Sequence, residues 1–229
     1  MSRRTLMQRF ARWHIWLGWI AAIPLIVWTA SGLIMAARPI DEVRGTTLRS
    51  ESPALPEDNR FAVPEVNGAA VRKMTLLQRV DGPVWVIERV DGSILASSAA
   101  SGEQLQGVTP ALARRIADAA LRAPGPVVEV RRFEADANPI DLRRGRPAWQ
   151  VRYADGLRVY VDADSGEVLA LRTRWWRFYD VMWGLHIMDP AGRENAHNPL
   201  VWLFGASALV TSLFGATLLL RRRRATNRA

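Results

Sequence analysis

The sequence predicts an α+β domain outside the cytoplasm, anchored by two transmembrane helices. An uncharged segment lies near each end of the 229-residue chain, and arginines flank the outer side of each segment. Between these segments, alternating apolar residues and Asp-Gly turns indicate strands. The chain contains no cysteine, which excludes disulfides, thiolate metal sites and cysteine nucleophiles.

Both uncharged segments are long enough to cross a bilayer as helices. The first covers 25 residues, 13–37, between Arg12 and Arg38, and the second covers 22 residues, 199–220. A bilayer core of about 30 Å needs roughly 20 helical residues. The apolar stretch of a cleaved signal peptide has only about 7–15 residues, so we expect the first segment to remain as an anchor.

The charge distribution predicts the orientation of the chain. The formal net charge is +9, and the acid-free termini, 1–12 and 221–229, carry all of it, because residues 38–220 hold equal numbers of acidic and basic side chains. Positive residues beside a span stay in the cytoplasm. We therefore expect cytoplasmic termini, spans in a bacterial inner membrane and a periplasmic central region. That neutral region lacks the basic face that a nucleic-acid partner requires.

Small residues recur at a spacing of four in both spans and predict close helix packing. Such stripes let helix backbones approach each other in lipid. The two spans of one chain can pack together in this way, and packing between two chains in a homodimer is the alternative. The stripes are Gly18 with Ala22, Gly32 with Ala36, and Ser207 with Thr211 and Gly215.

The central region, 38–172, carries signals for a helix and several strands. Thr109 followed by Pro110 is typical of a helix start, and a Pro-Gly-Pro sequence ends the predicted helix. Asp-Gly pairs at Asp91 and Asp155 lie between strand-like runs, as hairpin turns do. The predicted helix covers 111–121, and the predicted strands include 85–87, 149–153 and 157–161.

Part of the central region is repeated after 64 residues. Residues 84–105 align without a gap with 148–169, and eight of the 22 positions are identical, including an Asp-Gly and a Ser-Gly-Glu turn in each copy. Each copy predicts a strand, a tight turn, a second strand, a second turn and a short third strand. The repeat therefore predicts two tandem α+β modules or one pseudo-symmetric sheet.

The second copy resembles the end of a PepSY domain. Residues 159–169 predict a strand, an Asp, a Ser-Gly-Glu turn and a hydrophobic strand, which is the typical final hairpin of that domain. The first span, with Trp13-His14-Ile15-Trp16-Leu17-Gly18 leading to Ser31-Gly32, resembles the opening helix of PepSY-associated transmembrane proteins. Residues 183–199 resemble the approach to their last helix. The first copy resembles the family more loosely.

The resemblance implies two alternative functions. Isolated PepSY domains are associated with propeptides and peptidase inhibition, which implies a periplasmic binding, regulatory or accessory subunit with a protein or peptide partner. Larger transmembrane relatives include ferric-siderophore reductases that hold haem between their helices. They imply a subunit that binds haem b and moves electrons across the membrane for iron uptake. Because this chain has fewer spans than those relatives, such a site would need a homodimer or a membrane redox partner.

Three histidines are the candidate haem ligands, since haem iron commonly takes axial imidazoles: His14, His186 and His197. A span of 25 residues rises roughly 37 Å, so we expect His14 and His186 near opposite membrane faces, where one haem cannot bind both. Two chains could instead supply a pair of His14 side chains, a pair of His186 side chains, or His186 with His197.

The segment 173–198 is expected to form an amphipathic interfacial helix and a loop. His186 falls on the apolar stripe of that helix, where a charged imidazolium would be costly. His186 is therefore expected to bind a ligand, or to form a hydrogen bond with nearby backbone or with Asp189. His197 is the weakest candidate, because it precedes a helix start at Asn198 and Pro199.

No other constellation in the sequence indicates catalysis. A Gly-rich phosphate loop, an HExxH helix and a GxSxG elbow are all absent. Asp162, Asp164 and Glu167 do not have the spacing of a calcium loop, and Met182 with His186 is more typical of packing than of copper binding. The sequence favours a protein that is not an enzyme and has no metal site. The alternative is an oxidoreductase subunit.

Overall fold

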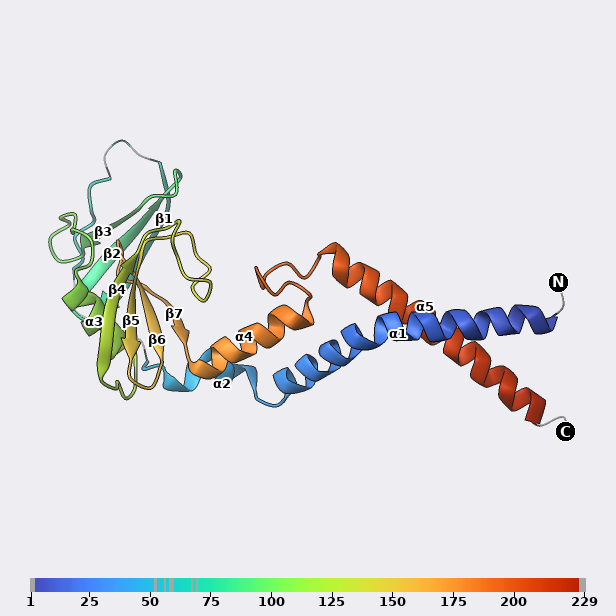
Figure 1. Cartoon of the computed structure of the whole chain (residues 1–229). Helices are drawn as coiled ribbons and strands as arrows, with labels where there is room; N and C mark the ends of the chain where they lie inside the picture. Colours follow the sequence, from blue (N-terminus) through green and yellow to red (C-terminus); the bar gives the residue numbers. More distant parts are fainter. Residues whose placement is uncertain are drawn as a thin grey trace. The chain divides into compact units, whose positions relative to one another are not determined.

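The computed structural model describes residues 3–51, 53–55, 57, 60–66, 68 and 70–226 (Figure 1). Side chains of residues 3–7 and 221–226 lie outside this description, so the predicted basic clusters at Arg3 and Arg4 and in 221–229 are not described. The chain divides into two compact units, Met1–Pro39 with Phe178–Ala229, and Ile40–Arg177.

The first unit is built around two long helices, α1 (Arg3–Ala36) and α5 (Pro199–Thr226). They run antiparallel and cross, so that both chain ends lie at the same end of the pair (Figure 1). The rings of Phe10 and Phe214 meet edge to face with centroids 5.1 Å apart. Both helices are long and apolar enough to cross a membrane over Gln8–Ala36 and Pro199–Leu220.

The start of α5 confirms the predicted helix cap. The backbone N–H of Val201 donates to Oδ1 of Asn198 at 3.1 Å, and Pro199 occupies the first helical position. Most large apolar side chains of the two long helices face outward, as lipid-facing side chains do; Trp19 is 74 % exposed and Trp202 is 72 % exposed.

The second unit contains two antiparallel sheets, with strand orders β1-β2-β3 and β4-β5-β6-β7. The fold class is therefore the predicted one: a mixed helix and sheet region between two apolar helices. The three-stranded sheet consists of β1 (Val71–Arg79), β2 (Gly82–Arg89) and β3 (Ile94–Ser98). The four-stranded sheet consists of β4 (Val127–Phe133), β5 (Ala148–Tyr153), β6 (Arg158–Asp162) and β7 (Val168–Arg172).

Three further helical segments belong to this unit: α2 (Ile40–Arg44), the 3-10 turn η1 (Thr46–Leu48) and α3 (Pro110–Ala119). The backbone N–H of Leu112 donates to the Thr109 hydroxyl at 3.3 Å, which confirms the predicted start of α3. The buried face of α3 presents Ala113, Ile116 and Ala117 to the four-stranded sheet. A last helix, α4 (Arg174–His186), begins in this unit and ends in the first.

The two copies of the repeat lie in different sheets. The first copy forms β2 and β3, and its expected third strand is reduced to one isolated bridge between Ser97 and Gln104. The second copy forms β5, β6 and β7. The difference has a physical cause, because β7 supplies the buried side chains of Leu169, Ala170 and Leu171, whereas the equivalent segment of the first copy runs directly into the cap of α3.

Candidate functional site

His186, the last residue of α4, is held by hydrogen bonds against the C-terminal half of α1. Its Nδ1 lies 3.1 Å from the backbone oxygen of Trp28 and 3.2 Å from the hydroxyl of Ser31. The Ser31 hydroxyl donates to the same Trp28 oxygen at 3.0 Å. The imidazole also stacks on the Trp28 ring, with centroids 4.8 Å apart and planes 18° apart.

A glycine on α1 leaves room for this imidazole. A Cβ atom added to Gly32 would lie 3.1 Å from Cε1 of His186. Since a carbonyl oxygen accepts only, the contact with Trp28 favours the tautomer that carries its proton on Nδ1. Nε2 then keeps a lone pair. His186 is thus directed at α1, whereas Phe178, Val181 and Leu185 of α4 are exposed.

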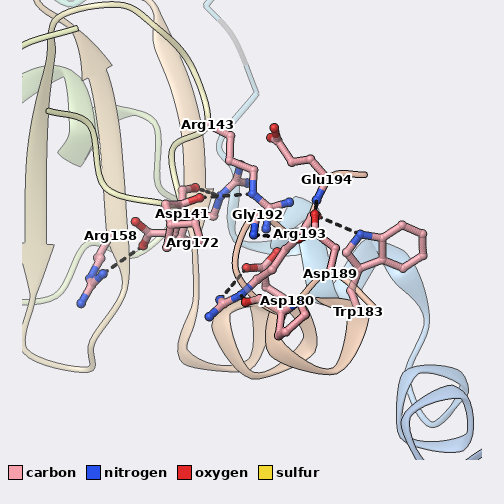
Figure 2. Close-up of polar contacts among 12 residues, drawn as sticks. Asp141, Arg143, Arg158, Arg172, Asp180, Trp183, Asp189, Gly192, Arg193 and Glu194 are labelled. Atoms are coloured by element: carbon pink, nitrogen blue, oxygen red, sulfur yellow. Dashed lines mark hydrogen bonds and ion pairs between the residues drawn. The ribbon is translucent and has the colours of Figure 1, made fainter. Parts of the chain in front are cut away.

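The predicted alternative partner of His186, Asp189, has another role. Its carboxylate accepts the backbone N–H groups of Gly192, Glu194 and Asn195 at 3.0, 3.2 and 3.1 Å. These backbone hydrogen bonds lower the pKa of Asp189 below its ordinary value. Asp189 therefore shapes the loop that joins α4 to α5 (Figure 2).

Arg193 connects the same loop to α4. Its guanidinium pairs with Asp180 at 3.0 Å, and its backbone oxygen accepts the indole N–H of Trp183 at 3.1 Å (Figure 2). Asn198 closes the loop by donating to the backbone oxygen of Ile187 at 2.8 Å. Sequence reasoning missed the pairing of Asp180 with Arg193. The only sign of this pairing in the sequence was a single acidic residue, Asp180, within a largely apolar helix. The sequence did not indicate which basic residue would pair with it.

His14 lies in a second glycine-lined position, between α1 and α5. A Cβ atom added to Gly215 would lie 3.1 Å from Cε1 of His14. The Nδ1 atom of His14 is buried and has no hydrogen-bond partner within the described part of the chain. Two glycines of the predicted small-residue stripes, Gly32 and Gly215, thus accommodate histidine rings, whereas a Cβ on Gly18 would meet nothing within 4 Å.

The structure does not bring the three histidines together. His186 contacts Ser31, which lies 17 residues after His14 on α1, so the two imidazoles are roughly 25 Å apart along that helix. His197 is exposed in the loop before α5, where its backbone N–H donates to Asn195 at 3.0 Å. No hydrogen bond or ring stacking joins any two of the three among the described residues.

A groove of about 690 Å³ lies in the central domain, beside α3. Leu76–Arg79 line it consecutively from β1, and on the other side it is lined by Gly166 and Glu167 of the turn before β7 and by Val168 and Leu171 of β7 itself. Side chains of a strand alternate between its two faces, so the consecutive lining residues of β1 indicate that the groove follows the edge of that strand. Among the described pairings, β1 pairs only with β2, and β7 pairs only with β6.

Arg79 spans one wall of this groove and is buried. Its guanidinium donates to Asp81 at 2.8 Å and to the backbone oxygen of Ser165 at 3.1 Å, so it connects the end of β1 to the turn before β7. Gly166 in that turn has φ +76°, and a Cβ there would lie 3.0 Å from Cδ of Arg79. Side chains of both charges, including Arg49 and Glu167, also line the groove.

A buried polar cluster around Asp141 supports the four-stranded sheet at Tyr160, away from the apolar core that packs on α3. The Tyr160 hydroxyl donates to Asp141 at 2.6 Å, and Arg158 pairs with the same carboxylate at 3.0 Å (Figure 2 shows Asp141 with Arg158). Burial, and next the hydrogen bond to Asp141, raise the pKa of Tyr160 well above its ordinary range. Arg172 donates to the Asp141 backbone oxygen at 2.6 Å. The several hydrogen bonds that converge on Asp141 give this cluster the character of a structural support.

The turn after β6 is also structural. Asp162 accepts the backbone N–H groups of Asp164 and Ser165 at 3.0 and 2.7 Å. Arg146 pairs with the other carboxylate oxygen at 2.8 Å. Within the described residues, no group of three His, Asp or Glu side chains is placed to hold a metal ion.

Comparison with known proteins gives one result. Residues 11–228 match a family model described as the PepSY-associated TM region. No similar protein was found among curated proteins, and none among solved structures.

Proposed function

Because the chain belongs to the family of PepSY-associated transmembrane proteins, we propose that it is a membrane-anchored accessory subunit whose central domain binds a protein or peptide. The groove between β1 and β7 is the observation that carries this proposal. A free strand edge presents unpaired backbone N–H and C=O groups, and an extended peptide satisfies them by adding as a further strand.

Two properties of the groove support an extended polypeptide as its occupant. The edge of β1 lines one side of the groove and the turn leading into β7 lines the other, so a segment lying in it would meet backbone groups of β1. Apolar side chains, among them Leu77, Ile116 and Val168, line the groove together with acidic and basic side chains. A site that binds every second side chain of an extended peptide is expected to have such a mixed lining.

The proposed location of this groove is the periplasm. The support is the distribution of arginines at the two outer flanks of the apolar helices. The antiparallel pairing of α1 with α5 agrees with it, because it leaves both basic termini at one end of the helix pair. The membrane concerned is the bacterial inner membrane.

Site-specific photo-crosslinking in intact cells tests the binding role. A photoreactive amino acid replaces Leu77 or Val168 in the groove, and Val90, which is 55 % exposed in the turn after β2, serves as the matched control. We expect a discrete adduct from both groove positions, with the modified sites clustered in one short segment of a single partner. Adducts that form equally from Val90, or none from the groove, contradict the proposal.

Haem binding is the second candidate function, and one observation favours it. Nδ1 of His186 is held by the Trp28 carbonyl, and this kind of hydrogen bond orients an imidazole whose other nitrogen binds a metal. His14 is the other candidate ligand, because its buried Nδ1 has no hydrogen-bond partner within the described residues. His186 and His14 would hold separate haems, each completed by a second chain or a redox partner. A bound haem b supplies one-electron transfer.

A reduced-minus-oxidised absorption spectrum of the full chain in mild detergent separates the two functions. A b-type band that is reduced in His186→Ala and unchanged in His197→Ala supports haem binding, because of these two only His186 is oriented by a backbone carbonyl. Equal losses in both variants contradict the role given to His186. A colourless preparation from haem-replete cells contradicts haem binding and leaves the groove as the functional site.

A further inference from the structure

Two arginines and two tryptophans share one face of α1 near its first residues. Arg9, Arg12, Trp13 and Trp16 follow the spacing i, i+3, i+4 and i+7 and together line a hollow of about 710 Å³. All four side chains are exposed, with Trp13 64 % and Trp16 66 % accessible. A smaller hollow of about 200 Å³, which Arg9 and Trp13 also line, extends to Phe214 of α5.

No protein carboxylate is available to these arginines. Within the described residues, neither Arg9 nor Arg12 has a hydrogen bond or an ion pair. Residues 1–40 and 195–229 contain no Asp or Glu, so both long helices lack acids along their whole length. The carboxylates of this unit lie on α4 and in its loop, where His186 meets Ser31, roughly 28 Å along α1 from Arg12.

The arrangement favours an anion from outside the chain. Residues three apart on a helix are neighbours, with Cβ atoms about 5–6 Å apart, and like charges in this relation repel. A phosphate between two guanidiniums removes that repulsion and accepts paired hydrogen bonds from each. Indole N–H groups beside them can donate to ester oxygens while the rings remain in an apolar layer.

We infer that Arg9, Arg12, Trp13 and Trp16 form a binding site for the headgroup of an anionic glycerophospholipid. The four residues lie at the start of the apolar span Gln8–Ala36, and Trp is the side chain typical of the membrane–water boundary. A zwitterionic headgroup would bring an ammonium group to two arginines, so the site selects a net negative lipid. This inference does not depend on the function proposed for the groove.

Native mass spectrometry of the full chain tests the site. The probe is an equimolar mixture of phosphatidylglycerol and phosphatidylcholine with identical acyl chains. We expect the wild-type chain to retain phosphatidylglycerol preferentially, and the double variant Arg9→Gln/Arg12→Gln to lose about thirtyfold in that preference, since an arginine at an anionic surface contributes about fivefold. Trp13→Phe keeps the ring but removes the N–H donor, and should lose a smaller part.

The matched control is Arg222→Gln/Arg223→Gln, which removes the same charge from the other helix terminus. It should lose clearly less preference than Arg9→Gln/Arg12→Gln. Equal losses would overturn the site, because they would show a diffuse attraction between basic ends and anionic lipid. Competition by millimolar inorganic phosphate would also overturn it, because the ligand would then be a free anion. Unchanged thermal unfolding of each variant shows that the fold is intact.

Discussion

At the scale of single residues, glycine determines where the two membrane-proximal imidazoles lie. Small residues at a spacing of four usually bring helix backbones together. In this chain Gly32 and Gly215 face the rings of His186 and His14 instead, and a Cβ on either glycine would lie 3.1 Å from the ring, closer than ordinary van der Waals contact. The small side chains therefore provide space for polar rings in an apolar environment.

Gly32→Ala should displace the His186 ring. The new Cβ would lie 3.1 Å from Cε1, so the ring must shift and the Nδ1 hydrogen bond to Trp28 must weaken. Gly18→Ala is the control, since a Cβ there meets nothing within 4 Å. We expect Gly32→Ala to be less stable than Gly18→Ala by about 1 kcal/mol, measured by thermal unfolding in detergent. Unchanged imidazole NMR shifts of His186 would contradict the displacement.

Tyr160→Phe should destabilise the central domain. The buried Asp141 carboxylate would lose a hydrogen-bond donor in a place that water does not reach, at a cost of about 1–3 kcal/mol. Tyr153→Phe is the matched control, because its partner Asp118 is 32 % exposed and water can replace the hydroxyl. Denaturant unfolding of the full chain should show the larger loss for Tyr160→Phe. Equal losses would contradict the role given to burial.

At the scale of elements, the loop between α4 and α5 is the most strongly organised connection in the first unit. Asp189 accepts three backbone N–H groups, Asp180 pairs with Arg193, and Asn198 bonds both Ile187 and Asn195 through its side-chain nitrogen. Gly192 is required there, because a Cβ would lie 2.9 Å from an Asp189 carboxylate oxygen. The loop therefore sets the spacing between α4, which carries His186, and the start of α5.

The stability of this loop should fall at acidic pH. The pKa of Asp189 is lowered in the folded chain by its backbone hydrogen bonds, so its contribution is complete above the unfolded pKa of about 3.9 and is lost as pH falls through the folded value. Protection factors of the Gly192, Glu194 and Asn195 amides, corrected for intrinsic exchange, should fall over that range. In Asp189→Asn they should be lower at neutral pH and independent of pH. A pH-dependent decrease in that variant would contradict the assignment.

At the scale of the whole molecule, one chain combines an apolar helical unit with a neutral α+β unit. The basic side chains that produce the net charge lie at the two termini, while the central unit pairs its arginines internally, as Arg158 does with Asp141 and Arg146 does with Asp162. This division places the electrostatic attraction to anionic lipid at the chain ends and leaves the central domain free of a single-sign surface.

Reporter fusions should locate the C-terminal end of the chain and the α+β unit on opposite sides of the membrane. A fluorescent protein fused after Ala229 should fluoresce, because it remains in the cytoplasm, and alkaline phosphatase inserted in the exposed turn at Gly92 should be active, because it reaches the periplasm. Replacing Arg221–Arg224 with Gln should weaken this orientation. An active phosphatase fused after Ala229 would contradict the proposed topology.

The sequence predicts the elements well where the signal is local. The spans follow from runs of uncharged residues, and the starts of α3 and α5 follow from Thr109-Pro110 and Asn198-Pro199, because a cap is built from adjacent residues. The third strand expected in the first repeat is where local similarity misleads, because a strand forms only where its side chains find a sheet to pack on.

The candidate sites divide in the same way. The sequence by itself determined the family, the two apolar helices and the histidines worth testing, because these depend on composition and spacing along the chain. Only the tertiary structure decided that His186 bonds to Trp28 rather than to Asp189, that Gly215 accommodates His14, and that the edge of β1 and the turn before β7 line one groove. Each of these contacts joins residues far apart in sequence, and local patterns carry no information about which distant surfaces will pack together.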